Sequence, residues 1–179
     1  MNLERQLDPD ALGDHIDRLY RAAWSLCGSR EEAEDLVQET FARILRKPRM
    51  LRSEDDLGYL LRVLRNTFFS QRRTAGRRPQ TTPLPDDLDL VEDRNATQPE
   101  SRIESAALYK AISELPEDFR DTLVAIDIVG LSYREASKAL RVREATITTR
   151  LHRARQRVAR SLTAEDSDPT SEQTRSRTS

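Results

Sequence analysis

Two segments of this 179-residue chain gather positive charge and could bind the phosphates of a nucleic acid. Between Tyr59 and Arg78 there are six basic residues and no acid. Between Arg141 and Arg160, seven arginines and a histidine stand against one glutamate. Arginine carries a planar fork of donors that suits phosphate oxygens and base edges. One such run is usually a solvated helix face, but two separate runs favour bivalent contact with nucleic acid.

The segment from Ser132 to Val158 has the pattern of a helix-turn-helix, in which a short capped helix and a three-residue turn precede a longer helix. One face of the longer helix is apolar, and the opposite face carries short polar and arginine side chains, which a reader of the major groove needs. A plain helical hairpin is the alternative, but its solvated face would favour a Glu/Lys mixture. The polar residues are Thr149, Arg153 and Gln156, flanked by Thr148 and His152.

Other reactive side chains do not form a pattern that supports catalysis. Five carboxylates gather on a polar stretch without a nearby histidine, so neither a di-metal bundle nor an acid/base pair is indicated. The single Cys27 cannot form an internal disulfide, and with only His15 and His152 it assembles no metal cluster. We therefore expect no enzyme, no metal and no cofactor. The five carboxylates are Glu31, Glu32, Glu34, Asp35 and Glu39.

The whole-chain charge conceals the basic segments. There are 30 Lys+Arg against 31 Asp+Glu, a net charge of −1, because residues 80–104 alone hold seven acids and two bases. A composition with 36% hydrophobic and 34% charged residues excludes membrane, collagen-like and disulfide-rich proteins. The N-terminus lacks the apolar region of a signal peptide, and no run of about 18 apolar residues occurs. We expect a cytoplasmic protein without membrane insertion.

Helical periodicity predicts an all-α fold of two small domains. In residues 8–75 three helices with short loops share one core. The first starts at Asp8-Pro9 and stops at Gly28, and the second starts at the capping box Ser29–Glu32 and closes at Pro48. The third starts between Ser53 and Asp56 and fades before Gly76.

The second predicted domain follows a break in periodicity. Residues 76–100 are rich in proline and acids and indicate a flexible linker. Residues 101–162 then predict four helices, starting at a capping box at Ser101 and ending with the helix-turn-helix. Residues 163–179 are almost without apolar side chains and are expected to be a disordered tail.

Several of these segments together resemble the extracytoplasmic-function (ECF) sigma factors of bacterial RNA polymerase. The resemblance covers about Leu12 to Leu162 in the family's order and spacing. The motifs are Asp35-Leu36-Val37-Gln38-Glu39-Thr40-Phe41, Tyr59-Leu60-Leu61-Arg62-Val63-Leu64-Arg65-Asn66-Thr67, Leu115-Pro116, Gly130-Leu131-Ser132-Tyr133-Arg134-Glu135 and Arg150-Leu151-His152-Arg153-Ala154-Arg155.

The resemblance implies roles for particular residues. The second helix would dock on the β′ coiled coil of core polymerase, the third helix and the loop after it would capture and melt the proximal promoter element, and the last helix would read the distal element. The implied core-binding residues are Asp35, Gln38, Glu39, Phe41 and Leu45. The implied melting residues are Val63 and Asn66 at a flipped base and Arg72, Arg73, Arg77 and Arg78 on the backbone. The implied distal-element residues are Thr148, Thr149, Arg150, His152, Arg153 and Arg155.

The chain departs from the family at the helix-turn-helix. Arg141 stands where a glycine is common, so a non-glycine residue must bear any left-handed strain there. Arg143 and Ala145 replace a common proline and glycine. The pair 136–137 is Ala-Ser rather than Ile-Ala, which thins the core contact, and Thr148-Thr149 replaces Lys/Arg-Ser, which removes one phosphate-binding cation.

These observations predict an alternative transcription initiation factor without enzymatic activity. Its implied partners are core RNA polymerase, through the β′ coiled coil and the β flap, promoter DNA, and an anti-sigma factor. The free protein would be compact, or held by an inhibitor, and core polymerase would separate the two domains by docking of the second helix. The alternative is a stand-alone helix-turn-helix regulator, which usually dimerises to read a two-fold site. No heptad or spare apolar face for such a dimer is evident, and the first domain would have no purpose.

Overall fold

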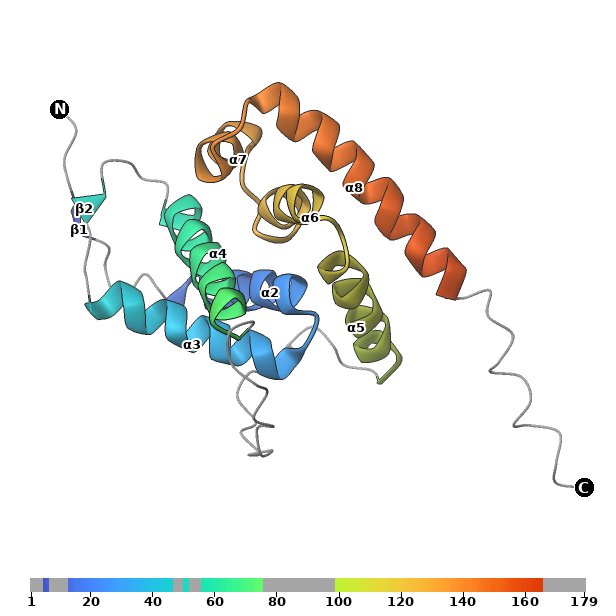
Figure 1. Ribbon diagram of the computed structural model, residues 1–179, viewed down its shortest axis with the longest axis horizontal. Helices are drawn as coiled ribbons and strands as arrows, with labels where there is room; N and C mark the ends of the chain where they lie inside the picture. Colours follow the sequence, from blue (N-terminus) through green and yellow to red (C-terminus); the bar gives the residue numbers. More distant parts are fainter. Residues whose placement is uncertain (1–4, 7–12, 47–49, 52–55, 76–98, 166–179) are drawn as a thin grey trace, which may run out of the picture.

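The computed structural model describes residues 5–6, 13–46, 50–51, 56–75 and 99–165, and in these ranges the expected all-α fold is confirmed (Figure 1). One antiparallel strand pair was not expected, with Arg5 opposite Leu51 and Gln6 opposite Met50. The first helices are α2 (Ile16–Cys27), α3 (Arg30–Arg46) and α4 (Asp56–Ala75), and the strands are β1 (Arg5–Gln6) and β2 (Met50–Leu51). The remaining helices are α5 (Pro99–Ser113), α6 (Glu117–Leu123), the π-helical η1 (Val124–Ile128), α7 (Tyr133–Leu140) and α8 (Glu144–Glu165).

Local signals set two of the ends of the first three helices. Gly28 ends α2 in the left-handed conformation, with φ 79°, and its N–H donates to the Trp24 carbonyl at 2.7 Å. At the start of α3 the Ser29 hydroxyl accepts from the Glu32 N–H at 3.5 Å, which supplies one half of the predicted capping box. The predicted start of α2 at Asp8-Pro9 lies outside the described residues, and the helix begins at Ile16.

Two helix ends in the second domain differ from the predicted ones. Helix α5 begins at Pro99 rather than Ser101, since proline suits the first turn of a helix. Helix α8 continues to Glu165, three residues into the expected tail, because helical bonding does not require an apolar face to the last turn. The linker residues 76–98 and the tail residues 166–179 lie outside the described residues.

The helix-turn-helix is held by bonds that its sequence specifies. The capping box at Ser132 is complete, because the Ser132 hydroxyl accepts from the Glu135 N–H and the Glu135 carboxylate accepts from the Ser132 N–H. Arg141 adopts φ 57° and ψ 42°, so a non-glycine residue does take the left-handed conformation at this turn. The Ser137 hydroxyl donates to the Val142 carbonyl at 2.5 Å, which ties the turn to α7.

The two helical groups pack against each other, as the expectation of a compact free protein requires. Helix α2 contacts α5 and η1, and α4 contacts α7 (Figure 1). The rings of Trp24 in α2 and Tyr109 in α5 lie 4.3 Å apart, and one buried cluster runs through both groups. The described residues of the two groups therefore share a single continuous core. We call this packed state of the two domains the closed arrangement.

Candidate nucleic-acid interface

Helix α8 turns a polar face outward, away from the core. Ile147, Leu151 and Ala154 are at most 2% exposed, and Val158 extends the same buried stripe. The predicted reading residues occupy the opposite side because a helix repeats every 3.6 residues. Thr148, Thr149, His152 and Arg153 are all exposed.

Local hydrogen bonds partly order this face. The hydroxyls of Thr148 and Thr149 donate to the carbonyls of Glu144 and Ala145 at 3.3 and 3.2 Å. The Gln156 amide nitrogen lies 3.1 Å from Nε2 of His152. The hydroxyls keep acceptor capacity, and Arg153 keeps its donors, so the face can bond base edges in a major groove.

Two of the predicted DNA-binding arginines of α8 are held by carboxylates of their own domain. Arg150 donates to Asp118 of α6 at 2.7 Å. Arg155 forms two bonds with Asp127 of η1, at 2.9 and 2.7 Å, and these bonds raise the pKa of its guanidinium. Both arginines therefore fix α8 to α6 and η1 in this state. Their predicted contacts with phosphate would require these ion pairs to break or to share the cation.

Sequence reasoning noted the two arginines at the turn as departures from the family but did not include them among the DNA-binding residues. Arg141 and Arg143 are exposed at the junction of α7 and α8, next to the N-terminal turns of the helix that would enter the groove. Their replacement of the family's glycine and proline is the signal that could have identified them. They can supply the positive charge that Thr148 and Thr149 remove.

The predicted melting residues lie on α4. Asn66, Arg72 and Arg73 are exposed, whereas Val63 is half-buried against the core. The Arg72 guanidinium lies 5.4 Å from the centre of the Phe68 ring, an aromatic that is itself buried. Helix α4 thus exposes an amide and two cations. Asn66 and Arg73, seven residues apart, share one side of the helix, and Arg72 lies on an adjacent side. The other two predicted residues, Arg77 and Arg78, lie outside the described residues.

The predicted core-binding residues lie along α3. Steps of three, four or seven residues connect Gln38 with Asp35, Phe41 and Leu45, whereas Glu39 lies beside Asp35 at the edge, so the set spans nearly half of the helix circumference. Leu45 is 54% exposed, which is high for a large apolar side chain. Glu39 pairs with Arg43 at 2.7 Å, and this bond lowers the pKa of the Glu39 carboxyl. The five residues are exposed Asp35, Gln38 and Leu45, and half-buried Glu39 and Phe41.

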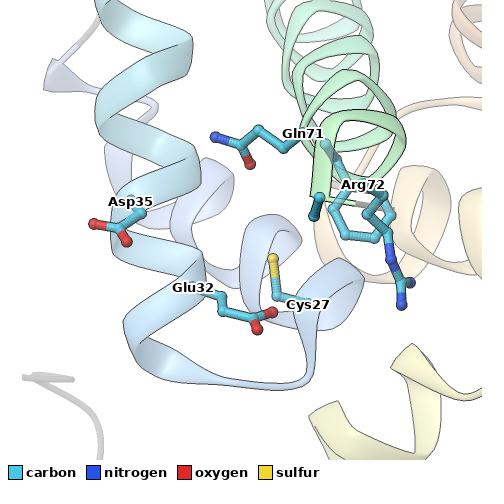
Figure 2. Close-up of a pocket in the computed structure, with 7 residues that line it drawn as sticks. Cys27, Glu32, Asp35, Gln71 and Arg72 are labelled. Atoms are coloured by element: carbon cyan, nitrogen blue, oxygen red, sulfur yellow. The ribbon is translucent and has the colours of Figure 1, made fainter. Parts of the chain in front are cut away.

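A cavity of about 550 Å³ separates the start of α3 from the end of α4. Figure 2 shows Glu32 directed toward Cys27, while Gln71 and Arg72 come from α4. Burial, with Glu32 as the largest charge effect, raises the pKa of the Cys27 thiol to about 12. The thiol is thus protonated at neutral pH and is a poor nucleophile.

No helix among the described residues is both long enough and apolar enough to cross a membrane.

Comparison with known proteins agrees with this arrangement of helices. Residues 12–78 match the family described as Sigma-70 region 2, and residues 105–158 match Sigma-70, region 4. The ECF RNA polymerase sigma factor SigE of Mycolicibacterium smegmatis is 40% identical over 148 residues, covering 80% of this chain and 57% of SigE. The chain thus spans little more than half the length of that relative.

Two further relatives are matched over more of their own length. The ECF RNA polymerase sigma factor SigM of Bacillus subtilis is 32% identical over 146 residues, covering 80% of this chain and 88% of SigM. The sigma factor RpoE of Bartonella quintana, in a co-crystal structure with the anti-sigma factor NepR, aligns with a TM-score of 0.64 and 25% identity, covering 86% of this chain and 95% of that chain. With both sigma-70 regions present in order, the chain belongs to the ECF family of RNA polymerase sigma factors, which are alternative transcription initiation factors.

Proposed function

We propose that the chain binds core RNA polymerase and directs it to promoters with a proximal and a distal element. Residues 8–75 form the polymerase-binding and melting domain, residues 76–100 the linker, and residues 101–162 the distal-element domain. The observation that carries the proposal is that three helices from two domains each present a different exposed polar face, on α3, α4 and α8.

The distal element is read by α8. Thr149, His152 and Arg153 contact base edges in the major groove, with Thr148 at the flank. Arg150 and Arg155 serve DNA binding by orienting α8 through Asp118 and Asp127, and by sharing their charge with nearby phosphates.

The proximal element is opened by α4. Unstacking a base costs a few kcal/mol, so the helix must offer replacement bonds. Asn66 supplies the amide donors and acceptor for a flipped base, and Val63 gives an apolar wall beside it. Arg72 and Arg73 hold the flanking phosphates, as Arg77 and Arg78 do from the following segment.

Core polymerase is bound by α3. Its exposed Leu45 and half-buried Phe41 form an apolar ridge that a partner helix pair can cover, and Asp35, Gln38 and Glu39 bond the partner's polar side chains. The partner surface is the β′ coiled coil, and the distal-element domain contacts the β flap. An anti-sigma factor holds the protein in its closed arrangement, a proposal supported by the RpoE–NepR complex of similar fold.

Run-off transcription with purified core polymerase on fragmented genomic DNA tests the proposal. We expect discrete transcripts only when the protein is added. Tight, sequence-specific binding of the protein alone to duplex DNA, with no transcript in the presence of polymerase, would instead establish the stand-alone regulator.

A further inference from the structure

Arg65 lies on α4 with its guanidinium turned toward α6 of the other domain. It directly precedes Asn66 and shares its side of the helix with Phe69 and Arg72, four and seven residues later. Its guanidinium lies 5.0 Å from the centre of the Phe69 ring. Consecutive residues of a helix lie about 100° apart, so Arg65 flanks Asn66 and, once released from the other domain, can reach a phosphate next to a base held at Asn66.

Two carboxylates of α6 occupy the donors of Arg65 in the closed molecule. Its Nη2 donates to Glu117 at 3.0 Å, and its Nε donates to Asp121. Carboxylates and phosphates match the arginine fork in the same way, so the two acids present to Arg65 the oxygens that a phosphate would present. The side chain of Arg65 is 27% exposed and that of Asp121 only 4%.

The contact is built to be specific rather than strong. Asp121 Oδ1 and Arg120 Nε are buried without a hydrogen-bond partner in the structure, although the two side chains lie 3.8 Å apart. Burial raises the pKa of the Asp121 carboxyl even though Arg65 opposes that shift. In a buried ion pair, the free energy lost by removing both charges from water roughly offsets their attraction. When the domains open, the charges regain their hydration, so breaking this contact has a small net cost in free energy.

We propose that Arg65 is a further promoter phosphate contact, and that Glu117 and Asp121 occupy it as internal phosphate mimics while the domains are closed. Closure and binding of the melted strand by α4 then exclude each other. This inference rests on the proposed function of α4, but it makes a claim about the free protein that needs no polymerase.

The test uses the full chain and a fluorescent single-stranded DNA pool of random sequence. Glu117→Gln removes the exposed mimic, and Glu114→Gln is its matched control, with the same change of charge at an exposed position whose carboxylate is not a partner of Arg65. We expect Glu117→Gln to tighten binding by about three- to tenfold, as one added phosphate contact would, and Glu114→Gln by less than twofold. In an Arg65→Met background, Glu117→Gln and Glu114→Gln should change the affinity for DNA equally.

Arg65→Met removes the cation that is hydrogen-bonded to buried Asp121 and leaves only Arg120, at 3.8 Å. Folding is therefore controlled with Arg65→Lys, which keeps the charge but loses the fork. Arg65→Lys should melt cooperatively and show intermediate affinity. The proposal would be overturned if Glu117→Gln and Glu114→Gln changed the affinity for DNA equally. It would also be overturned if neither Arg65→Met nor Arg65→Lys changed that affinity.

Mutual exclusion is tested by energy transfer between dyes on the two domains. The dyes sit on cysteines introduced by Arg46→Cys and Arg160→Cys, both at exposed positions, in a Cys27→Ser background. Single-stranded DNA should lower the transfer efficiency in proportion to binding. Saturating DNA with unchanged transfer would contradict the inference, whereas absent transcription with DNA-driven opening would count against the proposed function alone.

Discussion

Gly28→Ala is expected to weaken the packing of the two domains and to favour their separation. Gly28 ends α2 with φ 79°, and a Cβ added there would lie 2.5 Å from Ser113 Oγ and 3.1 Å from Ser113 Cβ, in α5 of the other domain. Rotation of Ser113 can move its hydroxyl, at the loss of its 2.7 Å bond to the Lys110 carbonyl. The 3.1 Å contact with Ser113 Cβ remains, so either α2 and α5 shift apart by a few tenths of an ångström at this point or the domains open.

Gly130→Ala is the matched control. Gly130 has φ 83° with nothing within 4 Å of an added Cβ, so its substitution carries only the left-handed strain, about 1–2 kcal/mol. Gly28→Ala carries the same strain plus overpacking of about 1–3 kcal/mol. The overpacking cost cannot exceed the free energy of separating the domains, since separation removes the clash.

Two measurements distinguish these contributions. In the dye-labelled protein, Gly28→Ala should lower the transfer efficiency and Gly130→Ala should leave it unchanged, while denaturant unfolding detects the strain in both. Ser113→Gly combined with Gly28→Ala should restore transfer, and the cycle of single and double variants isolates the contact between them. Equal transfer in the two alanine variants would refute the assigned domain contact.

Three further predictions concern the reading face, the turn and the buried thiol. Arg153→Ala should weaken discrimination at the distal element by about 1–3 kcal/mol in competition binding of the holoenzyme, whereas an equal loss on all sequences would make Arg153 a phosphate contact. Arg141→Gly should relieve left-handed strain and raise the free energy of unfolding by up to about 1 kcal/mol; a loss of stability would show that the Arg141 side chain stabilises the turn. Cys27, with its pKa raised by burial to about 12, should be alkylated at a rate that keeps rising from pH 9 to pH 11 in the folded protein, because the thiolate fraction still grows there. An alkylation rate that stops rising just above pH 9, as expected for an unfolded chain, would contradict the burial of the Cys27 thiol.

Signals that act within one turn of helix were predictable from the sequence. The stop at Gly28, the capping box at Ser132 and the left-handed Arg141 each follow from a residue and its near neighbours. The apolar face of α8 was predictable for the same reason, since periodicity determines which side of a helix is buried.

Contacts between distant segments were not predictable in this way. Arg150 and Arg155 were expected to face phosphates, but their carboxylate partners lie 32 and 28 residues earlier in the chain. The ion pairs of Arg65 were not foreseen either, since its partners lie 52 and 56 residues later. The strand pair was missed because two residues per strand are too few to show an alternating pattern.

Transcription from a promoter library with randomised upstream sequence, using the reconstituted holoenzyme, tests the central claim most directly. Sequencing of the transcribed templates should reveal two enriched blocks at a fixed spacing. Arg153→Ala should relax only the distal block, and Asn66→Ala only the proximal block. Transcripts that do not depend on the protein, or relaxation of the same block by both substitutions, would contradict the division of labour between α8 and α4.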